Sequence, residues 1–275
     1  SQKLEHYGFS KTEIKILEKI NEKDKKLDKK IEEIQRAKEN NVKIITILDK
    51  EYPKRLTDLR NPPLILFLKG SLPNLEKTIA IVGTRNASYF GRSVARILSK
   101  TLAKEFVIIS GMARGIDTEA HVGALEGNGK TIAVLGWIDP IYPKDNEELS
   151  RDIIKHGCII SERYAKPKNI KNALIKRNRI ISALSLGIIV VEAGEKSGAY
   201  HAVEAAKKLK RAIFVVKPSE EYLKEKRRVS KGYKRLKEKY NAIELEIDLK
   251  NIDETLKFIK RKLKITSKLD ELVTT

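Results

Sequence analysis

Six short apolar runs recur along the middle of the chain, and segments of helical periodicity separate them. The runs are rich in β-branched residues and apolar throughout, which is typical of parallel strands buried on both faces of a sheet. They lie at 78–83, 106–110, 131–136, 157–161, 187–193 and 212–218. After the first run, apolar residues fall at i, i+3, i+4 and i+8, which predicts a helix with one buried stripe. These residues are Val94, Ile97, Leu98 and Leu102. The alternation predicts an α/β fold with a doubly wound, mostly parallel sheet.

The segments on either side of these runs have a different pattern. Thirteen of the fifteen glycines fall between residues 41 and 218, which marks that stretch as the part built from turns and close backbone packing. It opens with apolar segments at 42–48 and 64–70. Residues 1–40 place apolar side chains at helical spacing among dense charges, so we expect an N-terminal helical extension. We expect residues 219–275 to form a basic, helical C-terminal extension, so that charged helical flanks enclose a core over 41–218.

The chain is strongly basic, with 57 Lys and Arg against 37 Asp and Glu and a net charge of +20. Residues 41–218 hold 30 of the basic and 17 of the acidic side chains, so the core carries +13 of this excess. Such an excess attracts polyanions, nucleic acid first and acidic membrane surfaces second. No apolar run reaches the roughly 18 residues of a membrane span, and the first residues lack a secretory layout. We therefore expect a cytoplasmic protein without a membrane partner.

Cysteine usage narrows the candidate chemistry. The single Cys158 lies in an apolar run and excludes both an internal disulfide and a cysteine metal cluster within one chain. We expect it to be a small buried hydrophobic residue.

The first strand end carries a glycine turn that runs toward a helix. A dinucleotide fingerprint needs glycines at positions 83, 85 and 88, whereas this sequence has Gly83, Arg85 and Ser88. NAD and FAD are therefore not expected, and the sequence predicts no cofactor. A turn at a helix N-terminus still offers free backbone N–H groups, and the planar guanidinium of Arg85 suits phosphate oxygens. A structural salt bridge of Arg85 is the alternative.

The second strand end, "SGMARGID" at 110–117, holds another glycine turn and another arginine, Arg114. The sequence predicts Asp117 as the N-cap of the helix that follows. Asp117 and His121 share a helix face at i, i+4, a spacing that suits a metal or an acid–base pair. Because no third ligand lies nearby, we favour a packed histidine and predict no metal site.

Two later strand ends add charge. Residues 163–179 contain seven Lys or Arg and no acid, and they follow the strand that ends at 161. Ser197 and Gly198 form a helix start suited to an anion, although Glu192 and Glu195 nearby would repel phosphate. Three basic strand ends on one rim predict a groove for a phosphodiester backbone, and a solvated basic face is the alternative.

These motifs, in this order, resemble the DNA-processing protein A family, DprA, also called Smf. The resemblance covers about residues 42–218 and includes "YPKRL", "IAIVGTR", "SGMARGID" and "RNRIISALS". It implies an extended Rossmann-like fold that binds single-stranded DNA, forms homodimers and delivers the strand to a RecA-type recombinase in transformation or recombination. It implies no catalysis.

Together, the strand ends and the resemblance predict a single-stranded DNA and phosphate site with no catalytic residue. Its residues are Gly83, Thr84, Arg85, Gly111, Arg114, Gly115, Lys171, Lys176, Arg177, Asn178, Arg179, Ser197 and Gly198. The chain departs from the family at Leu174 and Ile175, where members usually have Phe-Pro. An aromatic platform for a base is missing there, which predicts weaker and more electrostatic binding.

A rival hypothesis places a nucleotide sensor or a nucleoside-monophosphate hydrolase on the same fold. Related Rossmann-like proteins of that kind use an arginine and a glutamate near a glycine turn. Glu192 and Glu195 beside Ser197 and Gly198 keep this alternative open.

Overall fold

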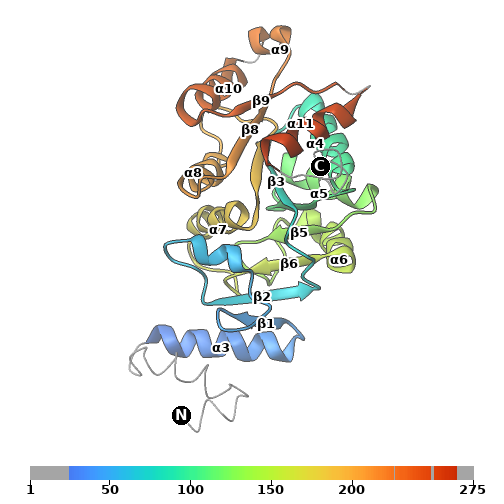
Figure 1. The fold of residues 1–275 in the computed structure, drawn as a ribbon. Helices are drawn as coiled ribbons and strands as arrows, with labels where there is room; N and C mark the ends of the chain where they lie inside the picture. The colour runs from blue at the N-terminus through green and yellow to red at the C-terminus, as the bar shows by residue number, and fades with distance from the viewer. Residues whose placement is uncertain (1–24, 226, 249–250, 265–275) are drawn as a thin grey trace.

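One sheet runs through the whole molecule in the computed structural model, which describes residues 25–225, 227–248 and 251–264. Its strands are β1 (Lys43–Thr46), β2 (Ile65–Gly70), β3 (Thr78–Val82), β4 (Val107–Ser110), β5 (Thr131–Val134), β6 (Cys158–Ser161), β7 (Gly187–Val190), β8 (Ala212–Val216) and β9 (Ile243–Leu245). Their order across the sheet is β1-β2-β6-β5-β4-β3-β7-β8-β9 (Figure 1). From β6 to β9 neighbouring strands are parallel, and β1 and β2 add an antiparallel edge. The predicted α/β, mostly parallel fold is confirmed.

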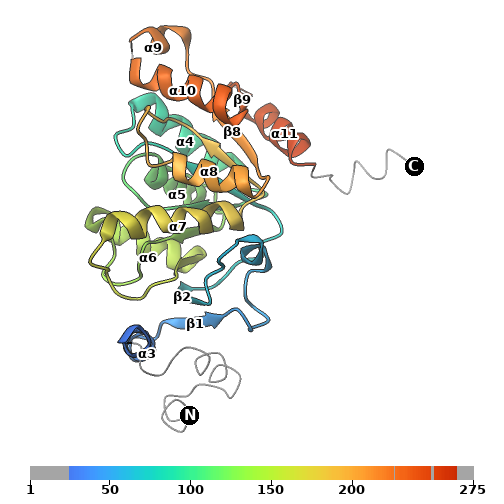
Figure 2. The same cartoon turned by 90° about the vertical axis from the view of Figure 1, so that its left-hand side faces the viewer.

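Helices cover both faces of this sheet. They are α3 (Lys25–Glu39), α4 (Tyr89–Leu102), α5 (Ile116–Glu126), α6 (Glu147–His156), α7 (Ile170–Leu184), α8 (Tyr200–Lys208), α9 (Glu220–Glu225), α10 (Arg227–Tyr240) and α11 (Ile252–Lys262), with short 3₁₀ turns at Lys54–Asp58 and Lys144–Asn146. In Figures 1 and 2, α4, α5, α6 and α11 lie on one face, and α7, α8 and α10 on the other. No helix in these described ranges combines the length and apolarity needed to cross a bilayer.

The central strands are apolar throughout because each side of the sheet is covered. In β3, Ile79 and Ile81 pack with α4, whereas Ala80 and Val82 pack with α7. In α4 the predicted stripe is buried, apart from the half-buried Ile97. Cys158 begins β6 and is fully buried, as expected. The strands therefore have no solvent face on which a polar alternation would appear.

The flanks are only partly as predicted. At the N-terminal side, α3 is helical and buries Ile34 and Ala37 against Phe67 of β2, while residues 1–24 lie outside the described part. The C-terminal segment was expected to be helical, but it also contributes β9, which pairs in parallel with β8. Apolar and acidic residues alternate from 243 to 246, a strand pattern, and Leu245 is buried with Phe214. The sheet thus continues past residue 218.

The strand order places a crevice at β3 and β7. These strands are neighbours, but α4 after β3 and α8 after β7 cover opposite faces of the sheet. The loops that leave their carboxyl ends must diverge, and ligands of open α/β sheets bind at such a switch point.

Candidate nucleic-acid interface

A cavity of about 800 Å³ lies at this switch point. Its walls come from the loops after β3, β4, β5 and β7 and from the sides of α7 and α8. A smaller cavity of about 70 Å³ adjoins it and shares Arg85, Ala113, Tyr142, Leu174 and Arg177 with it. The predicted rim of strand ends is therefore one continuous hollow in the structure.

Ten of the thirteen predicted site residues line these two cavities. The larger one takes Gly83, Thr84, Arg85, Lys171, Arg177, Asn178, Ser197 and Gly198, and the smaller one adds Gly111 and Arg114. Gly115, Lys176 and Arg179 line neither. Gly115 lies just behind the wall, where φ is +82° and a Cβ would approach the Thr84 carbonyl oxygen to 2.4 Å.

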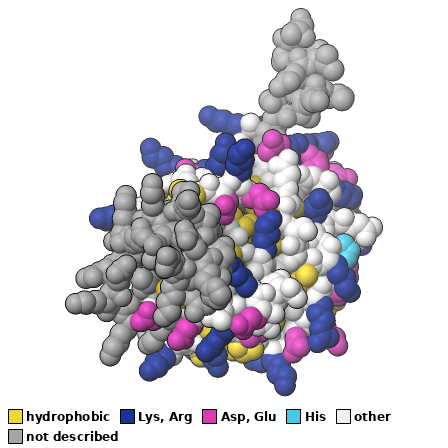
Figure 3. Space-filling model, turned by 90° about the horizontal axis from the view of Figure 1, so that it is seen from below, with side chains coloured by type: hydrophobic (Ala, Val, Ile, Leu, Met, Phe, Trp, Pro, Cys, Tyr) yellow, Lys and Arg dark blue, Asp and Glu magenta, His cyan; other side chains and the backbone are white. Residues whose placement is uncertain are grey.

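Three cations of the larger cavity have exposed side chains, namely Arg85, Lys171 and Lys196. These side chains form no ion pair and no hydrogen bond with the described residues, so within this part of the chain Arg85 does not make the structural salt bridge considered above. The one acid that the structure describes in the lining is Asp117, which is buried. The open part of the cavity thus presents positive charge. By contrast, Lys and Arg are interspersed with Asp and Glu on the end of the molecule shown in Figure 3.

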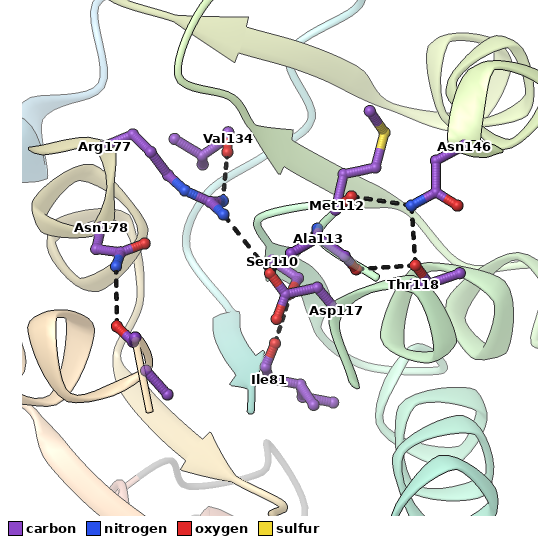
Figure 4. A network of polar contacts seen from close by, with 12 residues as sticks. Ile81, Ser110, Met112, Ala113, Asp117, Thr118, Val134, Asn146, Arg177 and Asn178 are labelled. Carbon is purple, nitrogen blue, oxygen red and sulfur yellow. Dashed lines mark hydrogen bonds and ion pairs between the residues drawn. The ribbon is translucent and has the colours of Figure 1, made fainter. Parts of the chain in front are cut away.

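Arg177 differs from these three because its side chain is committed to the protein interior. The residue is only 5% exposed, its Nη1 donates to the Val134 carbonyl oxygen at 2.6 Å, and Nη2 lies 3.7 Å from Asp117 Oδ2 (Figure 4). Burial lowers the pKa of Arg177 and raises that of Asp117, although the attraction between the two charges opposes both shifts. Arg177 therefore connects α7 to β5 and α5. It forms part of the cavity wall, but its guanidinium is held by partners in the protein interior.

The basic side chains of α7 lie in different environments. Lys171 lines the cavity and Arg177 points inward, while Lys176 is exposed outside both cavities. Arg179 pairs with Glu162 and donates to the Asn61 carbonyl oxygen at 2.9 Å. The predicted groove is thus basic along only part of this helix.

The structure corrects the role predicted for Asp117. The N-cap of α5 is Gly115, and Asp117 lies inside the first turn, where it accepts from the Ala113 N–H at 3.4 Å. His121 is fully buried with Nδ1 2.7 Å from Thr131 Oγ1. Burial lowers its pKa to about 3, so the imidazole is neutral. The favoured interpretation of His121 as a packed histidine is confirmed.

Asn146 and Tyr142 belong to this region but were not among the predicted site residues. Asn146 is buried, and its amide donates to the Met112 carbonyl oxygen and to Thr118 Oγ1, both at 2.9 Å (Figure 4). Met112 has a φ of +58°, so this amide supports a backbone conformation that a side chain disfavours. Both residues follow β5, and the only signal in the sequence was that they also come from a strand end.

The model of a family described as DNA recombination-mediator protein A matches residues 43–257. The chain belongs to this family. The match continues through β9 into α11, in agreement with the sheet, and the DprA/Smf membership expected from the sequence is confirmed.

Relatives of the chain include the DNA processing protein DprA of Bacillus subtilis, 40% identical over 187 residues, and that of Streptococcus pneumoniae, 39% identical over 173. These matches cover 65% and 62% of this chain, and 62% and 61% of those proteins. The chain thus spans less than two thirds of their length.

Among solved structures, the X-ray structure of S. pneumoniae DprA superposes with a TM-score of 0.71 at 31% identity, over 84% of this chain and 82% of that one. A structure of Helicobacter pylori DprA that describes its single-stranded DNA binding mode superposes with a TM-score of 0.67 at 30% identity, over 78% and 97%.

The two carboxylates behind the hydrolase alternative are turned away from the cavity of this DprA-family chain. Glu192 is buried at the start of α4, where its Oε2 accepts from the Ser88 N–H at 3.1 Å and from Ser88 Oγ at 2.6 Å. Ser88 in turn caps α4 by accepting from the Gly91 N–H. Glu195 is exposed and pairs with Lys231 at 3.5 Å. Neither glutamate lines the cavity, so neither is placed to act on a ligand there.

Glu192→Gln is therefore expected to act on stability and not on chemistry. The change removes a negative charge from the positive end of α4 and leaves one acceptor oxygen where two now accept from Ser88 and Tyr222, which costs about 1–2 kcal/mol. Urea unfolding would measure this loss, and release of free base from nucleoside monophosphates would be assayed in parallel. Base release by the wild type that the substitution abolishes would contradict this assignment.

Proposed function

We propose that this chain binds single-stranded DNA in the cavity at the switch point and acts as a mediator without catalysis. The observation that carries this proposal is the set of three cations around the cavity, Arg85, Lys171 and Lys196, which are unpaired within the described ranges, with Asp117 buried behind them. Phosphates of a strand would be held by these side chains. The backbone N–H groups of Arg85 and Gly198, which have no acceptor within the described residues, would add two donors.

The similarity to H. pylori DprA supports this proposal, since that protein binds single-stranded DNA and nearly its whole chain superposes on this one. We further infer that the bound strand is passed to a RecA-type recombinase by a homodimer. Such a role would place the protein in the cytoplasm with the DNA.

The test compares a single strand with a duplex at two salt concentrations. We expect an oligo-dT of about 30 nucleotides to bind more tightly than its duplex, and binding to weaken steeply between about 50 and about 200 mM salt. Arg85→Ala/Lys171→Ala should weaken binding at least about tenfold and lower the salt slope by about 0.7 for each phosphate that the variant no longer neutralises. Fluorescence anisotropy of a labelled oligonucleotide measures both quantities.

The matched control is Lys77→Ala/Lys104→Ala. Both lysines are exposed, and they lie at the opposite rim, where the amino ends of β3 and β4 begin. This variant removes the same number of charges and should bind like the wild type. Equal weakening in the two double variants would show that binding depends on overall charge, and the proposed site would then be wrong.

A further inference from the structure

Tyr142 places an exposed aromatic ring at the proposed site. It is 43% exposed and lines both the larger and the smaller cavity. The structure has other exposed large apolar side chains, which are Leu48, Leu64, Tyr89 and Phe90. None of those lines either cavity, so among the described residues Tyr142 is the one whose exposure coincides with the hollow.

The ring of Tyr142 is supported from behind. It packs against Trp137 with ring centroids 5.4 Å apart and planes inclined at 35°. Trp137 is buried, and its Nε1 donates to the Pro140 carbonyl oxygen at 2.8 Å. The support is therefore part of the folded core, and the exposed ring needs little further ordering to receive a ligand. A preorganised ring of this kind loses less entropy on binding than a mobile one.

The surroundings of the ring combine apolar surface with positive charge. Leu174 and Arg85 line both cavities with Tyr142, and Arg114 lines the smaller one. Arg114 is paired with Asp145 at 2.7 Å, but Arg85 has no ion pair among the described residues. A flat π-face within the same hollow as this guanidinium suits a ligand that joins a flat ring to an anion, and a nucleotide unit of a single strand has this chemistry.

We propose that Tyr142 stacks on a nucleobase of the strand whose phosphates Arg85 and Lys171 hold. This inference rests on the proposed function and adds to it a base contact that is independent of sequence, because every base has a π-face. Positions 174 and 175 of α7, where an aromatic platform would be expected, carry aliphatic side chains. The loop after β5 supplies a ring from another wall of the cavity.

The test uses Tyr142→Leu, which keeps apolar bulk and removes the π-face. We expect this variant to bind oligo-dT about tenfold more weakly than the wild type, with an unchanged salt slope. Tyr142→Phe should bind within about twofold, since stacking needs the ring and not the hydroxyl. Tyr89→Leu is the matched control, because Tyr89 is 88% exposed and lies outside both cavities. Thermal unfolding of each variant checks that the fold is retained.

An abasic strand separates stacking from a structural effect. On an oligonucleotide of the same length without bases, Tyr142→Leu and the wild type should bind equally, because no base is present to stack. Equal weakening by Tyr142→Leu on both strands, or no weakening on oligo-dT while Arg85→Ala/Lys171→Ala still reduces binding, would overturn the stacking interaction alone. A wild type that does not prefer the single strand would overturn the proposed function and this interaction with it.

Discussion

Replacing Arg177 with methionine is expected to lower the free energy of unfolding by about 3–5 kcal/mol, because it leaves Asp117 as a buried carboxylate without its counter-charge. Methionine has a similar length, so the change removes charge and hydrogen bonds more than volume. The Val134 carbonyl oxygen also loses the donor that now lies 2.6 Å away. Urea denaturation followed by circular dichroism measures the loss.

Arg179→Met is the control for this prediction. It removes the same functional group from the same helix, two residues further on, and breaks the ion pair with Glu162. That pair is partly exposed, so its removal should cost about 1 kcal/mol or less. Similar destabilisation in the two variants would contradict the assignment of Arg177 to a buried structural pair.

The destabilisation caused by Arg177→Met should depend on pH. Burial raises the pKa of Asp117 above its ordinary value even with Arg177 present, so the folded state holds this proton more tightly than the unfolded chain does. Without the guanidinium the pKa of Asp117 rises further, and the folded variant takes up a proton at a pH where the folded wild type is still ionised. Protonation then stabilises the variant relative to the wild type. We expect Arg177→Met to lower the free energy of unfolding more at about pH 8 than at about pH 5. An equal loss at both pH values would show that Asp117 is not its cause.

The central sheet could be predicted from the sequence because a local pattern of apolar residues marks each of its strands. Each of the six central strands is covered on both faces, so its residues are apolar throughout, and the intervening helices bury one stripe. Strand β9 was missed because it is only three residues long and is flanked by charged helical sequence. The alternation over residues 243–246 is a short local signal, but the pairing of this segment with β8 depends on the tertiary structure, which a local pattern does not reveal.

The site could be predicted by position but not in its details. The carboxyl ends of parallel strands meet at one edge, so the strand pattern predicted the loops after β3, β4 and β7 at the cavity, whereas the loop after β5, which carries Tyr142, was missed. Whether a basic side chain of α7 points into the cavity, into the interior or elsewhere depends on how the helix packs against the sheet. Arg177 lies on the stripe of Ala173, Ile180 and Leu184, and this spacing was a usable signal of burial. No sequence signal indicated that the Glu192 side chain points toward the start of α4. This contact forms because β7, which precedes Glu192, and β3, which precedes α4, are neighbours in the sheet.

Gly111→Ala is expected to destabilise the protein by about 3 kcal/mol or more through the same buried pair. A Cβ at this position would lie 1.5 Å from Nη1 and 2.1 Å from Cζ of Arg177. The end of an arginine side chain is normally flexible, but this one is enclosed between the Val134 carbonyl oxygen and Asp117. It has to leave both partners to make room. Gly198→Ala is the control, because a Cβ there meets no atom within 4 Å, and it should change the free energy of unfolding by at most about 0.5 kcal/mol.

Combining the two substitutions tests whether Gly111→Ala acts through Arg177. If the methyl group destabilises the fold by expelling the guanidinium, then its cost should be small in an Arg177→Met background, where that guanidinium is already gone. The double variant would lose much less stability than the sum of the two single effects, whereas independent effects add within about 0.5 kcal/mol. Additive effects would mean that Gly111 is required for the backbone path of the loop after β4. A strongly non-additive result would mean that the glycine leaves the space in which Arg177 connects α7 to α5 beneath the cavity.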